Sequence, residues 1–284
     1  MSSLFIFGMG YTATRIARAF RARGWAVSGT RRTADAETIA FDDEEGVHAA
    51  LRRATHILSS VPPEGDADPV LENYGESIAG SPAQWIGYLS STGVYGDTGG
   101  AWVDESAPVG HGRRSARAAA DAAWLTLSRD VRVFRLPGIY GPGRSALERV
   151  AEGKAHRIDL AGQVFSRIHV DDIVSGVIAA LEGPAGAYNL ADDLPAPQNA
   201  VIEHACALLG LPCPPLLPVG QAGLSPAARA FYAENRRVAN GKARRLLGWS
   251  PRYPDYRAGL RALKAMTSPT SASTQPAAAS SDQR

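Results

Sequence analysis

A glycine motif close to the N-terminus has the spacing of a phosphate-binding loop. Gly8-x-Gly10-x-x-Ala13 follows the apolar run 4–7 and precedes a stretch with helical periodicity. In that setting the glycines permit a tight turn and close approach of the backbone to a pyrophosphate, and Ala13 permits close packing of helix on strand. The helix N-terminus adds free N–H groups and the positive end of the helix dipole. We therefore expect a dinucleotide site formed by Gly8, Gly10, Tyr11, Thr12 and Ala13.

The end of the second predicted strand discriminates between NAD and NADP. An NAD site places a carboxylate about 20 residues after the first glycine, where it binds the ribose 2′-hydroxyl. This chain has Thr30, Arg31 and Arg32 there instead. Guanidinium groups match a 2′-phosphate in charge and in forked geometry. We predict NADP as cofactor, bound in part by these three residues; the alternative is that both arginines are solvated surface side chains.

Strands alternate with helices along the first half of the chain. The apolar patterns predict strands at 4–7, 25–29, 38–41, 55–59, 84–89 and 131–136. Helical patterns lie between them, one ending at Gly24 and others at 44–53, 70–79 and 113–128. This order predicts an α/β fold with a Rossmann-type, doubly wound parallel sheet.

Length and composition are those of a globular protein. The 284 residues are 45% hydrophobic and 20% charged, enough to form a core without disulfide or metal staples. A net charge of +2 does not favour nucleic acid or an anionic membrane as partner. Residues 1–10 lack the basic segment of a signal peptide, and no run of 18 apolar residues occurs. We expect a cytoplasmic protein in which Cys206 and Cys213 are reduced thiols.

The later part of the chain is less regular. A helix is predicted at 173–181, with Asp171 or Asp172 as its cap. His169 and Asp171 are residue types found in catalytic triads and metal sites, but we interpret them as the start of this helix. The remaining histidines have no metal-ligand spacing with one another or with the cysteines, so no metal is predicted. Residues 266–284 have the composition of a disordered tail.

Six further segments resemble, in order, hallmark segments of the extended short-chain dehydrogenases/reductases, which include nucleotide-sugar epimerases and dehydratases. The resemblance extends to about residue 265, and the shortened glycine motif is similar to that of an atypical branch. The segments are Leu89–Asp97, Asp104–Pro108, Arg135–Gly143, Ile168–Ile173, Ala187–Leu190 and Leu246–Pro251.

The resemblance implies a domain organisation. It predicts a Rossmann domain over residues 1–165, to which 166–190 returns, and a smaller C-terminal substrate lobe formed mainly by 191–265. Pro137 and Tyr140 are expected beside the cofactor, on the family's loop next to the nicotinamide. A homodimer formed through two helices that flank the central strands, around 70–79 and 113–128, is also implied.

The family's catalytic group is a serine or threonine with a Tyr-x-x-x-Lys pair, and this chain departs from it. Ser91 fits the serine position, but the alignment places Arg113 at the tyrosine and Arg117 at the lysine. No Tyr-x-x-x-Lys pair occurs anywhere in the chain, because the residues four before its three lysines are Val150, Val238 and Leu260.

Arginine cannot act as a general acid at ordinary pH, because it does not deprotonate in proteins. Arg117 is therefore expected to bind ribose or phosphate and Arg113 an anionic substrate, with two solvated helix arginines as the alternative. Tyr95, Tyr140 and His111 are the other candidate proton carriers, and none of them is assigned as the acid.

Two functions follow from these residues. The first is an NADP-dependent oxidoreductase or epimerase that moves a hydride to or from a small polar, sugar-like substrate. The alternative is a non-catalytic NADP-binding protein, such as a redox sensor or a scaffold, that has kept the cofactor site without the catalytic pair.

Overall fold

A seven-stranded parallel sheet forms the centre of the larger part of the molecule. The computed structural model describes residues 2–110 and 115–267. Every strand pair in this sheet is parallel. The predicted doubly wound α/β fold is therefore confirmed. In spatial order the strands are β11 (Gly186–Asn189), β7 (Val131–Leu136), β5 (Trp85–Ser91), β4 (His56–Ser59), β1 (Ser3–Phe7), β2 (Ala26–Arg31) and β3 (Ile39–Ala40).

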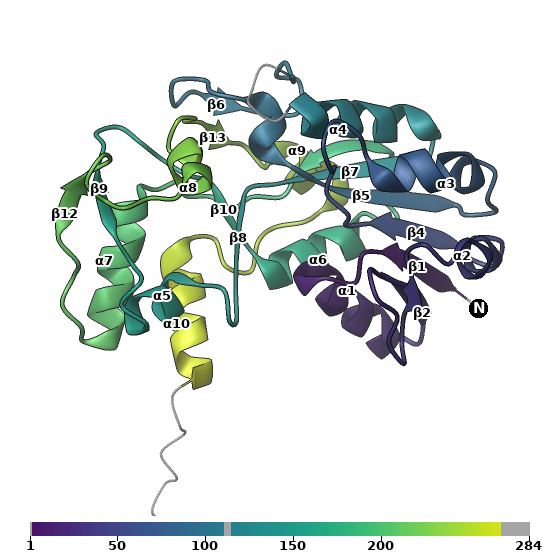
Figure 1. The fold of residues 1–284 in the computed structure, drawn as a ribbon, viewed down its shortest axis with the longest axis horizontal. Helices are drawn as coiled ribbons and strands as arrows, with labels where there is room; N and C mark the ends of the chain where they lie inside the picture. The colour runs from purple at the N-terminus through teal and green to yellow at the C-terminus, as the bar shows by residue number, and fades with distance from the viewer. Residues whose placement is uncertain (1, 111–114, 268–284) are drawn as a thin grey trace, which may run out of the picture.

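Helices cover both faces of the sheet (Figure 1). Alternate residues of β1 point to opposite faces. Leu4 and Ile6 pack with α1, α6 and α9, and Phe5 and Phe7 pack on the other side with α2, α3 and α4. The helices are α1 (Tyr11–Ala22), α6 (Val170–Ala179), α9 (Gly241–Leu247), α2 (Glu44–Leu51), α3 (Pro69–Ala79) and α4 (Ser115–Leu127).

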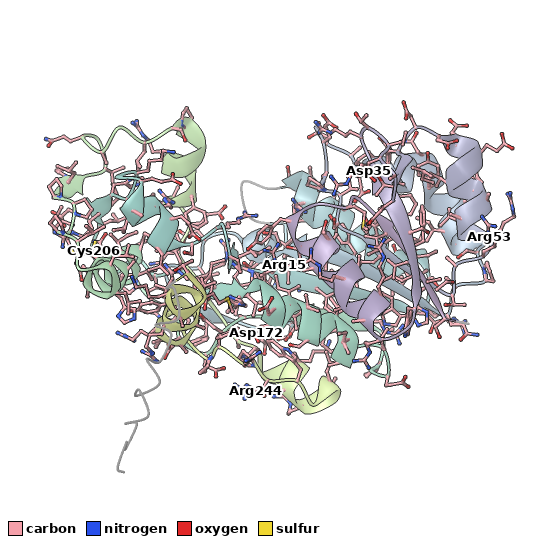
Figure 2. The ribbon with its side chains drawn as sticks, turned by 90° about the horizontal axis from the view of Figure 1, so that it is seen from below. Arg15, Asp35, Arg53, Asp172, Cys206 and Arg244 are labelled. Atoms are coloured by element: carbon pink, nitrogen blue, oxygen red, sulfur yellow. The ribbon has the colours of Figure 1, made fainter. Side chains whose placement is uncertain are left out.

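A second group of elements forms a smaller lobe with its own core, seen at the left of Figure 1. Leu147, Ile202 and Leu260 come from three different helices of this core. Cys206 lies in this lobe, at the opposite end of the molecule from Arg53 (Figure 2). The lobe contains α5 (Ala146–Ala151), β9 (Arg157–Asp159), α7 (Gln198–Leu209), β12 (Leu216–Pro218), α8 (Pro226–Phe231) and α10 (Tyr256–Thr267).

Short strand pairs bring segments far apart in the sequence together beside the sheet. β8 (Gly138–Tyr140) pairs with β10 (Arg167–His169), and β13 (Arg237–Val238) pairs with β6 (Trp102–Val103). A 3₁₀ helix, Thr92–Tyr95, follows β5 directly. These segments surround the carboxyl ends of β5 and β7, where ligands bind in open α/β sheets.

The predicted cap of α6 is wrong. The helix begins at Val170, and His169 Nδ1 accepts from the amide of Asp171 as its cap. Asp172 instead accepts from the amides of Arg252 and Tyr253, at 2.7 and 3.1 Å. A buried carboxylate is more strongly stabilised by two buried N–H donors than by a cap position near solvent. Through these two hydrogen bonds, Asp172 of α6 holds the segment 252–253, which precedes α10.

The two cysteines lie in the part of the chain that the structure describes, whereas some predicted residues do not. Cys206 and Cys213 are both free cysteines, as predicted. Within residues 2–110 and 115–267, no helix combines the length and the apolar character needed to cross a membrane. His111, Arg113 and the predicted tail beyond 267 lie outside the described residues.

Candidate functional site

The glycine loop is held in place by residues behind it. Gly8 has φ +81°, and its amide donates to Thr30 Oγ1 at 3.1 Å. The Met9 amide donates to the Thr30 carbonyl at 2.8 Å, and Ser60 Oγ donates to the Gly8 carbonyl. Thr30 is fully buried. In this structure Thr30 supports the turn that precedes α1.

The N-terminus of α1 is open to an anion. Its cap residue, Gly10, offers no side-chain hydrogen bond, and its first turn has no acidic residue. In α2 and α3, by contrast, Asp43 and Asp68 accept from the first amides. A Cβ built on Gly10 meets nothing within 4 Å, and Gly10, Tyr11 and Thr12 all line a cavity. These residues fit the pyrophosphate of a dinucleotide.

Tyr11 connects the glycine loop to the loop after β8. The guanidinium of Arg15 lies 4.0 Å and that of Arg144 5.6 Å from the centre of its ring. Its hydroxyl donates to the Pro142 carbonyl at 3.1 Å. Figure 2 shows Arg15 on the part of α1 nearest the smaller lobe. The two arginines add positive charge beside the open helix N-terminus.

The arginines at the end of β2 lie at the surface. Arg31 Nε lies 3.3 Å from Asp35 Oδ2, and both side chains are about half exposed. Hydrogen bonds from Glu37 and Thr38 keep the pKa of Asp35 below its usual range. Arg32 is also exposed. Any phosphate bound here shares Arg31 with Asp35.

One cavity of about 480 Å³ joins the glycine loop to the end of β5. Gly10, Tyr11 and Thr12 line one part of it. Ser91, Arg117 and Pro137 line another. The structure thus brings together these six predicted residues, whereas Gly8, Ala13, Thr30, Arg31, Arg32 and Tyr140 are not part of its wall.

Ser91 and Arg117 face the cavity from different elements. Ser91 is the last residue of β5. Its hydroxyl accepts a hydrogen bond from the Gly93 amide at 3.1 Å and so caps the N-terminus of the 3₁₀ helix. Arg117 lies on α4 beside the buried Tyr88 and lowers its pKa, but burial is the larger effect and the pKa is raised overall. The partner predicted for Arg117, Arg113, lies outside the described residues.

Neither of the predicted tyrosine proton carriers lies in the wall of this cavity. Tyr95 is 2% exposed; its hydroxyl donates to Asn189 Oδ1 at 2.8 Å and accepts from Arg135 at 3.1 Å. Burial raises the pKa of Tyr95 to about 12. Tyr140 lines a second cavity instead, and burial raises its pKa as well. Both groups are poor proton donors where they lie.

A buried ionic network lies beneath the serine loop and was not predicted from the sequence. Asp121 on α4 is fully buried and accepts from Arg135 of β7, at 2.7 Å to Nη2. Ser90, which lines the cavity, donates to the same carboxylate at 2.7 Å. The available signal was a pair of charges in apolar surroundings, one in the alanine-rich helix and one in the strand Val131–Leu136.

Arg236 and Arg144 also line the main cavity and were not predicted. Arg236 is held by the Gly96 carbonyl at 2.6 Å and by Glu234 at 2.9 Å. With Arg117 they give the cavity three arginines, against the carboxylate of Glu234. The charge balance suits an anionic ligand.

Two curated proteins are similar to this chain in sequence. No family model matches the chain. A Streptomyces 3-diazoavenalumate denitrifying reductase is 35% identical over 158 residues, so the match spans about half of each chain. Protein YeeZ of Escherichia coli is 24% identical over 90% of this chain and 97% of its own length.

Solved structures extend the likeness over nearly the whole chain. A conserved protein of unknown function from Silicibacter pomeroyi is 42% identical, with a TM-score of 0.87 over 94% of this chain and 99% of its own. The human epimerase family protein SDR39U1 with NADPH has a TM-score of 0.74 at 19% identity, over 93% of this chain and 99% of its own. The dTDP-glucose 4,6-dehydratase of Bacillus anthracis with NAD has a TM-score of 0.76 at 16% identity, over 93% and 96%.

The chain has the fold of the NAD-dependent epimerases and dehydratases. The fold implied by the resemblance of the sequence segments is confirmed. Structures with this epimerase/dehydratase fold contain NADPH in one case and NAD in the other, so the fold accommodates either dinucleotide.

Proposed function

We propose that the protein is an NADP-dependent oxidoreductase that transfers a hydride to or from a small-molecule substrate. The observation that carries this proposal is the single cavity that runs from the amides of α1 to Ser91. A cofactor whose phosphates meet the first turn of α1 would have its nicotinamide end near Ser91 and Pro137. The match to a reductase over half of the chain agrees with this reaction class.

We assign a different role to each group of residues in the cavity. When bound, the nicotinamide supplies or accepts the hydride. The amides of Tyr11 and Thr12 bind phosphate, with Arg144 adding charge. Ser91 hydrogen-bonds the reacting oxygen of the substrate, and Arg117 stabilises negative charge there or on the ribose without giving up a proton. The buried pair of Asp121 and Arg135 fixes the end of β5 that carries Ser91.

A binding titration is the first test. We expect NADPH to bind about tenfold or more tightly than NADH at one salt concentration, because a charged hydrogen bond to the 2′-phosphate contributes about 1.5–3 kcal/mol. Arg31→Asp is expected to remove this preference, and an unchanged ratio would contradict the assignment of Arg31. A Thr126→Ala protein, changed at an exposed site on α4, serves as control.

Turnover tests the catalytic half of the proposal. Ser91→Ala is expected to reduce kcat by roughly 100-fold while leaving NADPH affinity unchanged. Normal turnover in this variant would remove Ser91 from the mechanism. Thr126→Ala is expected to behave as wild type in the same assay.

A second function has its own observation. Arginines stand at both positions of the usual Tyr-x-x-x-Lys pair in the sequence, and neither Tyr95 nor Tyr140 lines the main cavity. A non-catalytic NADP-binding protein, such as a redox sensor or scaffold, would bind NADPH tightly and show no hydride transfer to any carbonyl compound or nucleotide sugar.

The other features implied by the sequence stay predictions. A cytoplasmic location, a homodimer and the absence of a nucleic-acid partner belong to this proposal, as do the limits of the substrate lobe, mainly 191–265.

A further inference from the structure

A second cavity of about 480 Å³ adjoins the first on the side of the smaller lobe. The two cavities share Gly138, Ile139, Arg144, Phe165, Ser166 and Phe231 as wall residues. A substrate that reacts beside Ser91 in the first cavity can therefore extend its other end into the second. The chemistry of this second wall limits what that end can be.

The second cavity is lined by a buried arginine. Arg167 is 7% exposed. Its Nη1 donates to the carbonyls of Phe165 and Ala196 at 2.8 and 2.9 Å, and its Nη2 donates to Gln198 Oε1 at 2.9 Å. These acceptors are all neutral. They fix the plane of the guanidinium but leave its charge uncompensated.

No carboxylate of the described residues lies within 4.0 Å of the Arg167 guanidinium. Asp192 is nearby, since its amide donates to the Arg167 carbonyl at 2.7 Å. Burial raises the pKa of Asp192 to about 8, although Arg167 pulls in the opposite direction. The Asp192 carboxyl group thus lies near the arginine without forming an ion pair with it within 4.0 Å.

Four aromatic side chains form part of the remaining wall. The rings of Phe165 and Phe231 stack at 4.5 Å with an angle of 9° between them. Phe231 is 43% exposed although it lines both cavities. Tyr140 and Tyr256 add two further aromatic side chains. Such a wall favours a flat, apolar body, which can stack on aromatic rings at small entropic cost.

Two more arginines border the same space. Arg144 and Arg149 are exposed and line the second cavity with Glu148 and Glu152. Glu148 is engaged locally, because it accepts from the amides of Gly143 and Ser145. With Arg167, the second cavity is lined by three arginines against two glutamates, so positive charge predominates in its wall.

We propose that the second cavity binds the carboxylate and aromatic ring of the substrate, with Arg167 and Arg149 as the anion-binding residues and Phe231 as the stacking surface. This inference rests on the proposed hydride-transfer function and names its substrate class as aromatic carboxylic acids. A guanidinium fork matches a carboxylate in plane and spacing. The assignment replaces the sugar-like substrate expected from the sequence.

The test measures binding in the presence of saturating NADP⁺, so that it does not depend on turnover. The probes are 4-hydroxycinnamate, its uncharged amide and UDP-glucose, titrated by calorimetry. We expect the acid to bind about tenfold or more tightly than the amide, because only the acid compensates Arg167. Equal binding of acid and amide, or tighter binding of UDP-glucose, would overturn the proposal.

Variants separate the two parts of the site. Phe231→Ala is expected to weaken acid and amide alike, by roughly five- to tenfold. Arg149→Ala and Arg167→Gln are expected to bring the ratio of the two affinities toward one. Arg261→Ala, an exposed change on α10 outside both cavities, is the matched control. A ratio that persists in the Arg149→Ala protein and in any folded Arg167→Gln protein contradicts the assignment.

The outcomes also distinguish this inference from the proposed function. If NADPH fails to bind to the wild-type protein, the proposed function fails. If NADPH binds with the expected preference but the acid and the amide bind equally, only the substrate class is wrong.

Discussion

Two buried arginines of this protein are held in opposite ways. Arg135 lies beneath the main cavity at 4% exposure, and Arg167 lies in the wall of the second at 7%. Arg135 contacts the Asp121 carboxylate through Nε and Nη2, which raises its pKa despite burial. Arg167 donates to neutral oxygens, and burial lowers its pKa. Among the described residues, Arg135 has a carboxylate within ion-pair distance and Arg167 does not.

The difference separates a structural role from a binding role. A buried ion pair is sensitive to loss of one partner, because the remaining charge is left without compensation. A buried cation bordered by a cavity already bears part of that cost in the free protein, and an anionic ligand relieves it. Arg135 therefore has a structural role at the end of β5 that carries Ser91, whereas Arg167 is available to bind a substrate.

Removing the counter-charge of Arg135 is the strongest test of this contrast. Asp121→Asn is expected to lower the free energy of unfolding by about 3–5 kcal/mol, because it leaves a buried guanidinium unpaired. Urea denaturation followed by circular dichroism measures the change. A loss below about 1 kcal/mol would mean that the pair is solvated and that the two arginines do not differ.

The pH dependence of stability probes the surroundings of Arg167. The pKa of Asp192 is about 8 in the folded protein and 3.8 in a model peptide, so the unfolded chain loses this proton first. Stability is thus expected to fall as pH rises from about 4 to 8, by at most about 1.4 kcal/mol per pH unit for this one proton. Asp192→Asn should remove this contribution and become the more stable protein at pH 8. Parallel curves for the two proteins would show that Asp192 is ionised beside Arg167.

Neutralising Arg167 is expected to cost less than breaking the Asp121 pair. Arg167→Gln loses hydrogen bonds to neutral acceptors, each contributing about 0.5–1.5 kcal/mol, but it also removes an uncompensated charge. We expect a net loss of about 1–2 kcal/mol in the same denaturation experiment. A loss as large as that of Asp121→Asn would indicate a hidden counter-charge.

An exposed ion pair provides the baseline. Arg21 and Glu37 lie 3.0 Å apart with 36% and 69% of their side chains exposed. Glu37→Gln is expected to change the free energy of unfolding by less than about 1 kcal/mol, and the change should shrink in 0.5 M salt. If the change in the free energy of unfolding is the same in 0.5 M salt, the Arg21–Glu37 pair behaves like a buried ion pair.

Local patterns explain why much of the fold and part of the site were predictable. The alternation of apolar runs located the seven parallel strands, apart from β11, and the helices between them, because side-chain periodicity is a property of neighbouring residues. The glycine motif likewise predicted an open helix N-terminus, which the uncapped start of α1 provides. The cap of α6 was mispredicted because Asp172 is bound by amides about 80 residues away.

The sequence by itself determined the α/β order, the glycine loop and the absence of a Tyr-x-x-x-Lys pair, since each depends on residue types at short spacing. Only the tertiary structure decided that Tyr95 lies buried and hydrogen-bonded to Asn189 and Arg135, and that Ser91 and Arg117 share one cavity. It alone also gave Arg135 a carboxylate partner, and in residues 2–110 and 115–267 it gave Arg167 none within 4.0 Å. Burial and ionic partnership depend on contacts between distant segments, and the free energy of a charge is set by those surroundings.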